Sequence, residues 1–124
     1  MEFNKYTGIV KLKIYEEDRF FKFGTAHMAL LCELLGKSLP EVTDLLGDQT
    51  NLDVQIKYYY AAAVSYVRLY NDEHEDKMKE PTLNQVANWF DGLMADQREK
   101  INEVAFAQAF PNGEAPKDQT EGQS

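Results

Sequence analysis

The chain has 124 residues, of which 44 % are hydrophobic, so it is long enough for one domain with its own core. Its 21 acidic and 13 basic residues give a net charge of −8. This balance argues against general affinity for nucleic acid or anionic membranes, because both need clustered Lys and Arg. No apolar run reaches the ~20 residues of a membrane span, and we expect no signal peptide.

The first predicted element is a β-hairpin over residues 8–24. Residues 8–15 alternate between apolar and polar side chains, as in a half-buried strand, and the apolar face holds Val10, Leu12 and Ile14. A polar turn over residues 16–19 and a return strand over residues 20–23 complete the hairpin. Because an isolated hairpin is only marginally stable, we expect it to lie on the helices that follow.

The remaining elements are predicted to be helices, which makes the fold mainly α, with a hairpin and about five helices in one small domain over residues 1–110. Ser38 and Thr82 each begin a capping box, and Gly36 and Gly47 are typical helix stops. These signals predict helices over residues 25–35, 38–46, 52–71, 82–94 and 96–110. Residues 111–124 contain no large apolar side chain and are predicted to be a disordered polar tail.

No group of residues has the pattern of a catalytic or metal site. His27 and His74 are the two histidines, and neither has a second His or Cys at ligand spacing. The single cysteine, Cys32, lies in an apolar run that is typical of a buried, inert thiol. We therefore expect no catalytic residue, no metal and no cofactor, and a protein that is not an enzyme.

The long helix is apolar on nearly all sides. One stripe, expected to face the core, holds Leu52, Ile56, Tyr59, Tyr60, Ala63, Val67 and Tyr70. The opposite side is apolar too, with Val54, Tyr58, Ala61, Ala62, Ser65 and Leu69. Either other elements of the chain cover both sides, or a partner covers the second. In the second case the candidate contacts are Val54, Tyr58, Ala62 and Leu69.

The last two helices contain further candidate contacts. Phe106 and Phe110 lie one turn apart and away from the stripe formed by Ile101, Val104, Ala105 and Gln108. They are candidates for anchoring a partner, although Phe110 has the alternative of folding back onto the core. Trp89 is a further candidate, because its neighbour Phe90 already fits the core face of its helix.

The order of these elements resembles that of the tail assembly chaperones of long-tailed phages and prophages. The resemblance covers residues 8–110 and rests on the segments Phe20–Thr25, Leu30–Gly36, Tyr58–Ala63, Pro81–Thr82 and Trp89–Asp91. It implies a non-catalytic protein of tail morphogenesis that binds the tape measure protein, keeps it soluble and helps to recruit the tail tube protein. It also implies a cytoplasmic location in the bacterial host and absence from the mature virion. Apolar surface together with net charge further predicts self-association when no client is bound.

Two other functions remain open at this point. One is a minor structural protein of the tail or of head completion, which would stay in the virion. The other is a small acidic regulator that binds a host protein, with its negative charge imitating nucleic acid. Both alternatives, like the chaperone, are binding functions without catalysis.

Overall fold

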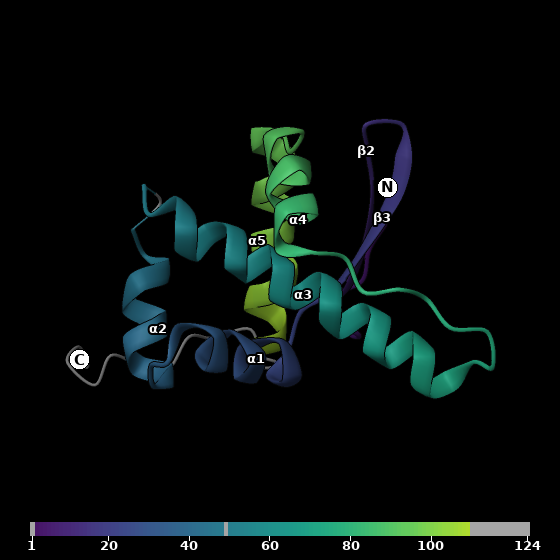
Figure 1. Ribbon diagram of the computed structural model, residues 1–124. Helices are drawn as coiled ribbons and strands as arrows, with labels where there is room; N and C mark the ends of the chain where they lie inside the picture. The colour runs from purple at the N-terminus through teal and green to yellow at the C-terminus, as the bar shows by residue number, and fades with distance from the viewer. Residues whose placement is uncertain (1, 49, 110–124) are drawn as a thin grey trace.

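The computed structural model describes residues 2–48 and 50–109, without the side chains of residues 106, 108 and 109. Within this range a three-stranded antiparallel sheet precedes five helices in one small domain (Figure 1). The elements are β1 (Glu2–Phe3), β2 (Ile9–Ile14), β3 (Glu17–Lys22), α1 (Thr25–Leu35), α2 (Leu39–Leu46), α3 (Leu52–Glu73), α4 (Leu83–Asp91) and α5 (Ala95–Ala109). The predicted mainly helical domain with an N-terminal hairpin is confirmed, and β1 is an additional strand.

The sheet has the order β1-β2-β3 and buries one face. The alternation predicted for β2 is confirmed, since its buried side chains are Val10, Leu12 and Ile14. The predicted turn over residues 16–19 was wrong. Ile14 pairs with Glu17, so the turn consists of Tyr15 and Glu16, with φ of 53° and 70°. Positive φ at both central residues makes a tight turn that suits the twist of the strands, and neither residue signals it in the sequence.

The ends of the short helices follow local chemistry. Gly36 adopts the left-handed conformation with φ of 65° and ends α1. Ser38 accepts a hydrogen bond from the backbone N–H of Glu41, and the Glu41 carboxylate accepts one from the backbone N–H of Ser38. Thr82 and Gln85 form the same capping box at the start of α4. Both predicted capping boxes are therefore confirmed.

Helix α3 runs through the middle of the molecule (Figure 1). It contributes side chains to two apolar clusters. It contacts α1, β3 and α4, which explains why it is apolar on nearly all sides. The larger cluster joins α3 to the sheet, α4 and α5, and the smaller one joins it to α1 and α2. Leu52, predicted in the core stripe, is instead 57 % exposed, because the buried part of the helix begins at Val54.

Helix α4 ends at Asp91, earlier than the predicted boundary at residue 94. Gly92 follows it and lies directly against the hairpin. A Cβ atom added to this glycine would lie 2.8 Å from Cγ2 of Ile14 and 3.0 Å from Cζ of Tyr15. The close approach of the α4–α5 connection to the hairpin therefore requires a glycine here, and α5 then packs Ile101 and Val104 into the larger cluster.

Candidate partner-binding surface

Two of the residues predicted to bind a partner lie inside the fold. Val54 is 3 % exposed and Ala62 is 0 % exposed, so neither presents a surface to another chain. The prediction for these two residues was wrong, because the chain itself covers the second side of α3. Ala61 packs against Leu31 of α1 and Val42 of α2, while Ala62 belongs to the larger cluster.

Tyr58 also contributes to internal packing. Its ring centroid lies 4.7 Å from that of His27 and 5.5 Å from that of Phe23. Burial raises the pKa of its phenol well above the ordinary range, with a smaller contribution from Tyr59. Tyr58 contacts both apolar clusters and connects them, which is a structural role rather than the predicted contact with a partner.

The other predicted contact residues are scattered. Leu69 is half-buried near the C-terminal end of α3. Trp89 is half-buried on α4, where its ring meets Phe21 edge-on at a centroid distance of 6.3 Å. Phe106 belongs to α5, but its side chain lies outside the described residues, as does the whole of Phe110. The structure therefore does not bring the predicted residues together into one surface.

The helix that sequence reasoning did not single out, α1, has an apolar outer side. It buries His27 and Leu31 against α3, yet Ala26, Ala29 and Leu34 are exposed and Leu30 is half-buried. The one Asp, Glu, Lys or Arg residue within α1 is Glu33. An amphipathic surface helix normally has a polar side facing water, and α1 lacks one. The sequence contains a signal of this apolar side, because α1 is rich in leucine and has few of the charged residues that a surface helix normally carries.

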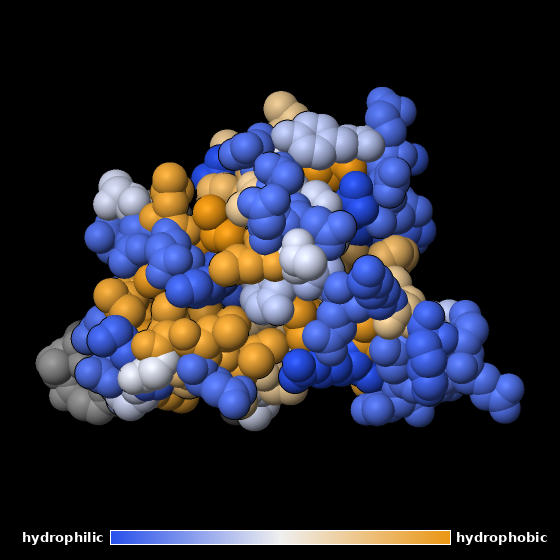
Figure 2. All heavy atoms as spheres, in the orientation of Figure 1, coloured by the Kyte–Doolittle hydropathy of each residue, from blue (hydrophilic) through white to orange (hydrophobic). Residues whose placement is uncertain are grey.

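Exposed leucines continue from α1 onto the neighbouring elements. Leu34 is 37 % exposed and Leu39, the first residue of α2, is 52 % exposed. Figure 2 shows apolar side chains gathered over α1, α2 and the N-terminal half of α3. We call this region the leucine surface and define it by Leu30, Leu34, Leu39 and Leu52. Groups of exposed apolar side chains often mark binding surfaces in soluble proteins.

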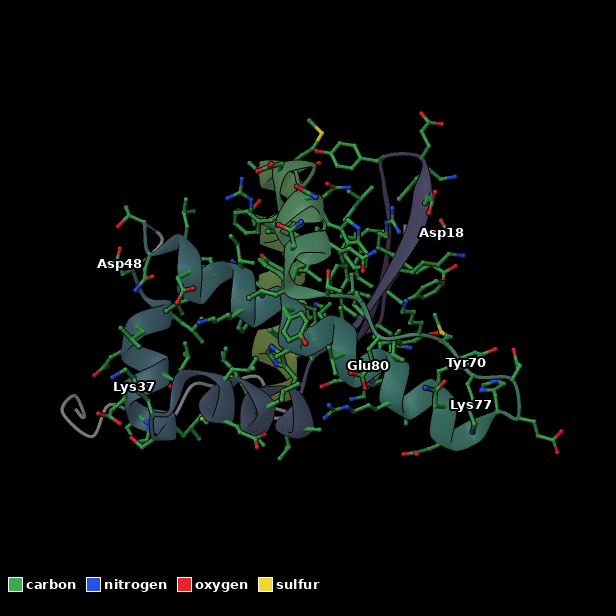
Figure 3. The ribbon with its side chains drawn as sticks, viewed as in Figure 1. Asp18, Lys37, Asp48, Tyr70, Lys77 and Glu80 are labelled. Carbon is green, nitrogen blue, oxygen red and sulfur yellow. The ribbon has the colours of Figure 1, made fainter. Side chains whose placement is uncertain are left out.

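The charges on α1, on α2 and between them are mainly acidic. They comprise the carboxylates of Glu33, Glu41 and Asp44 and the ammonium group of Lys37. The capping box with Ser38 lowers the pKa of the Glu41 carboxyl, so this group stays ionised at neutral pH. Figure 3 shows Lys37 and Asp48 at opposite ends of α2. A partner that covers the leucine surface therefore meets net negative charge at its border.

Neither a candidate metal site nor a helix able to span a membrane occurs among the described residues. Residues 2–48 and 50–109 contain no group of three or more His, Cys, Asp or Glu placed to hold a metal ion. Among the same residues no helix is long and apolar enough to cross a membrane. Cys32 is half-buried on α1.

Comparisons with protein-family models, with curated proteins and with solved structures gave no match to this chain. The features of the chain that bear on its function are the leucine surface, the charges around it and the order of the elements.

Proposed function

We propose that this chain is a non-catalytic binding protein that covers an apolar helix of a partner with its leucine surface. The observation that carries the proposal is the outer side of α1, which exposes leucine and alanine where a solvent-facing helix would expose charge. A helix with apolar residues at a spacing of three and four residues fits such a surface, because its side chains enter between the leucines.

The resemblance to tail assembly chaperones suggests which partner this is. We propose the tape measure protein as the client, bound in the cytoplasm of the bacterial host during tail assembly, with the tail tube protein as a further partner. In this function the leucine surface covers apolar helical segments of the client before they are packed into the tail. The net charge of −8 then keeps the complex soluble.

Charge complementarity indicates which helical segments of the client this surface binds best. Because three carboxylates and one ammonium group lie on and between α1 and α2, a helix with Lys or Arg beside its apolar stripe binds better than an acidic one. A second copy of this chain would bring two acidic borders together. Self-association through the leucine surface is therefore expected to be weak at low salt and stronger when salt screens the repulsion.

Co-expression with the tape measure protein of the same genome tests the proposal. We expect the tape measure protein to be soluble only when this chain is present and to co-purify with it. A double variant, Leu34→Lys with Leu39→Asp, should abolish this effect. It keeps the net charge and places each new charge at the helix end that the helix dipole favours, so folding should be preserved.

Met94→Asp is the matched control, because Met94 is an exposed hydrophobic residue outside the leucine surface. It should leave both solubility and co-purification unchanged. If the double variant keeps its circular dichroism spectrum and still solubilises the client, the leucine surface is not the binding site. If the tape measure protein is insoluble with the unaltered chain as well, the proposed client is wrong.

A further inference from the structure

The outer edge of β3 has free hydrogen-bonding groups. Strand β3 pairs with β2 on one side, and no strand pairs with its other side among the residues that the structure describes. Glu17, opposite Ile14, closes the hairpin, and the N–H of Phe23 still donates to the carbonyl of Gly8 at the far end. In an antiparallel pair the bonded residues alternate, so the backbone N–H and C=O groups of Asp18 and Phe20 point away from β2.

A groove of about 310 Å³ lies along this edge. Besides Asp18, Arg19 and Phe20 of β3, its walls come from α3, from residues 78–82 and from α4, including Tyr66, Pro81 and Trp89. In Figure 3 Asp18 lies on β3 and Glu80 lies below it, on the segment that leads to α4. Its volume is near the lower end of the range of about 300–1,000 Å³ for ligand pockets.

Arg19 has an unused donor at this groove. Its guanidinium group lies 4.6 Å from the ring centroid of Trp89, and its Nη1 atom is 3.3 Å from the carboxylate of Glu17. Its Nε atom is buried and has no hydrogen-bond partner among the described residues. The free side of the guanidinium group, formed by Nε and Nη2, is the one that binds carboxylates through two parallel hydrogen bonds.

The charged side chains that line the groove are two acids, Asp18 and Glu80, and two bases, Arg19 and Lys79. The carboxylate of Asp18 is 3.9 Å from Lys11, and that of Glu80 is 3.0 Å from Arg68, so both acids have a cationic partner. Lys79 lines the same groove and forms no ion pair with the described residues. Arg19 is paired with Glu17 in the same way, which leaves Lys79 and the unsatisfied Nε donor of Arg19 to attract a carboxylate locally.

We propose that the edge of β3 binds an extended peptide segment of a partner as an additional strand, with an Asp or Glu of that segment opposite Arg19. Asp18 and Phe20 supply the backbone hydrogen bonds on either side. The backbone N–H and C=O groups of Arg19 point toward β2. A residue of an antiparallel partner strand opposite Arg19 therefore forms a non-hydrogen-bonded pair with it, the kind of pair in which the two side chains lie closest. The acidic side chain then lies beside the guanidinium group above Trp89, and a shift of the Arg19 side chain exposes its buried Nε to the carboxylate.

A titration followed by nuclear magnetic resonance tests this site separately from the leucine surface. The probe is a short acetylated and amidated peptide in which threonine and valine alternate around one central glutamate. We expect it to shift the backbone amide signals of Asp18 and Phe20 and the indole signal of Trp89. The same peptide with glutamine in place of glutamate should bind about tenfold more weakly.

Two variants of this chain complete the test. Arg19→Gln should weaken the glutamate peptide about tenfold and remove its preference over the glutamine peptide. Arg98→Gln is the matched control, because Arg98 also stacks on an aromatic ring, that of Phe90, but does not line the groove. If Arg19→Gln alters the circular dichroism spectrum, Arg19→Lys keeps the positive charge and the aliphatic stem while removing the paired donors, and it should reduce the preference without abolishing it.

Three results would overturn the proposal. The first is the absence of shifts at Asp18 and Phe20 at saturating peptide. The second is equal binding by a peptide whose alternate backbone nitrogens are methylated, since it cannot form the hydrogen bonds of a strand. The third is a set of shifts confined to α1 and α2, which would mean that the peptide binds the leucine surface instead.

Discussion

His27 and Tyr58 connect α1 to α3 through a hydrogen bond of 3.0 Å between the imidazole Nε2 and the backbone carbonyl oxygen of Tyr58. Because a carbonyl only accepts, Nε2 carries the proton of the neutral imidazole. The other ring nitrogen, Nδ1, is buried and has no partner among the described residues. Burial, reinforced by the charge of Lys22 and partly offset by the hydrogen bond to Tyr58, lowers the pKa of His27 to about 4.

The first prediction is that His27 makes the fold less stable in mild acid. The unfolded chain binds a proton at this imidazole below its ordinary pKa of 6.5, whereas the folded chain does so only near pH 4. The free energy of unfolding therefore falls as the pH is lowered from 6.5 to 4, by about 3 kcal/mol from this group. Urea denaturation at several pH values measures this change.

His27→Leu isolates this contribution from that of the carboxyl groups, which titrate in both proteins. The carbonyl of Tyr58 remains inside α3, so the variant leaves no buried acceptor without its helical partner. The difference in unfolding free energy between the two proteins should change with pH by the same amount of about 3 kcal/mol. A difference that stays constant between pH 4 and 7 would show that His27 titrates normally in the folded state.

The second prediction concerns the hairpin turn. Glu16 has a φ of 70°, a conformation that costs a residue with a Cβ atom about 1–2 kcal/mol. Glu16→Gly should therefore stabilise the protein by about 0.5–1 kcal/mol, because part of the gain is lost to the greater freedom of glycine in the unfolded chain. Glu17→Gly, which removes the same charge from the adjacent strand position, should destabilise it. Thermal denaturation of both variants measures the two effects, and a lower melting temperature for Glu16→Gly would contradict a costly positive φ at this residue.

The parts of the fold that were predictable from the sequence depend on local chemistry. The capping boxes at Ser38 and Thr82 and the left-handed Gly36 each act within a few residues, so their patterns were enough. The turn was misplaced because Tyr15 and Glu16 adopt positive φ against their own preference, and only the register of the buried strand face imposes it. The strand Glu2–Phe3 is too short to show any periodicity.

The candidate site was less predictable, because burial of α3 depends on elements far apart in the sequence. An apolar second side on this helix fits either a partner or internal packing. Only the positions of the other elements around α3 decide between these possibilities for Val54 and Ala62. The apolar outer side of α1 could have been predicted from the sequence, since the helix lacks charged residues except Glu33. The groove beside Arg19 could not have been predicted in this way, because β3, α3 and α4 all contribute to it.

The third prediction is that Gly92→Ala destabilises the protein by about 1–3 kcal/mol. The new Cβ atom would lie 2.8 Å from Cγ2 of Ile14, which is buried and has little room to move. Gly47→Ala is the matched control. Gly47 has ordinary helical φ, and a Cβ atom there would approach a single atom, the carbonyl oxygen of Asp44, at 3.3 Å. Urea denaturation should show less than about 1 kcal/mol for the control, and equal effects would contradict the close contact.

The fourth prediction concerns the segment that leads from α3 to α4. The side chain of Asn71 accepts a hydrogen bond of 2.7 Å from the N–H of Met78 and donates one of 3.1 Å to its carbonyl. Asn71→Ala removes both, and the segment then opens more often. Trypsin, which cuts after Lys77 and Lys79, should cleave it about thirtyfold faster, since two net hydrogen bonds of about 1 kcal/mol each correspond to that ratio. Asp72→Ala is the control, because the side chain of Asp72 is exposed and forms no hydrogen bond with the described residues. Equal cleavage of both variants would mean that Asn71 does not hold the segment in place.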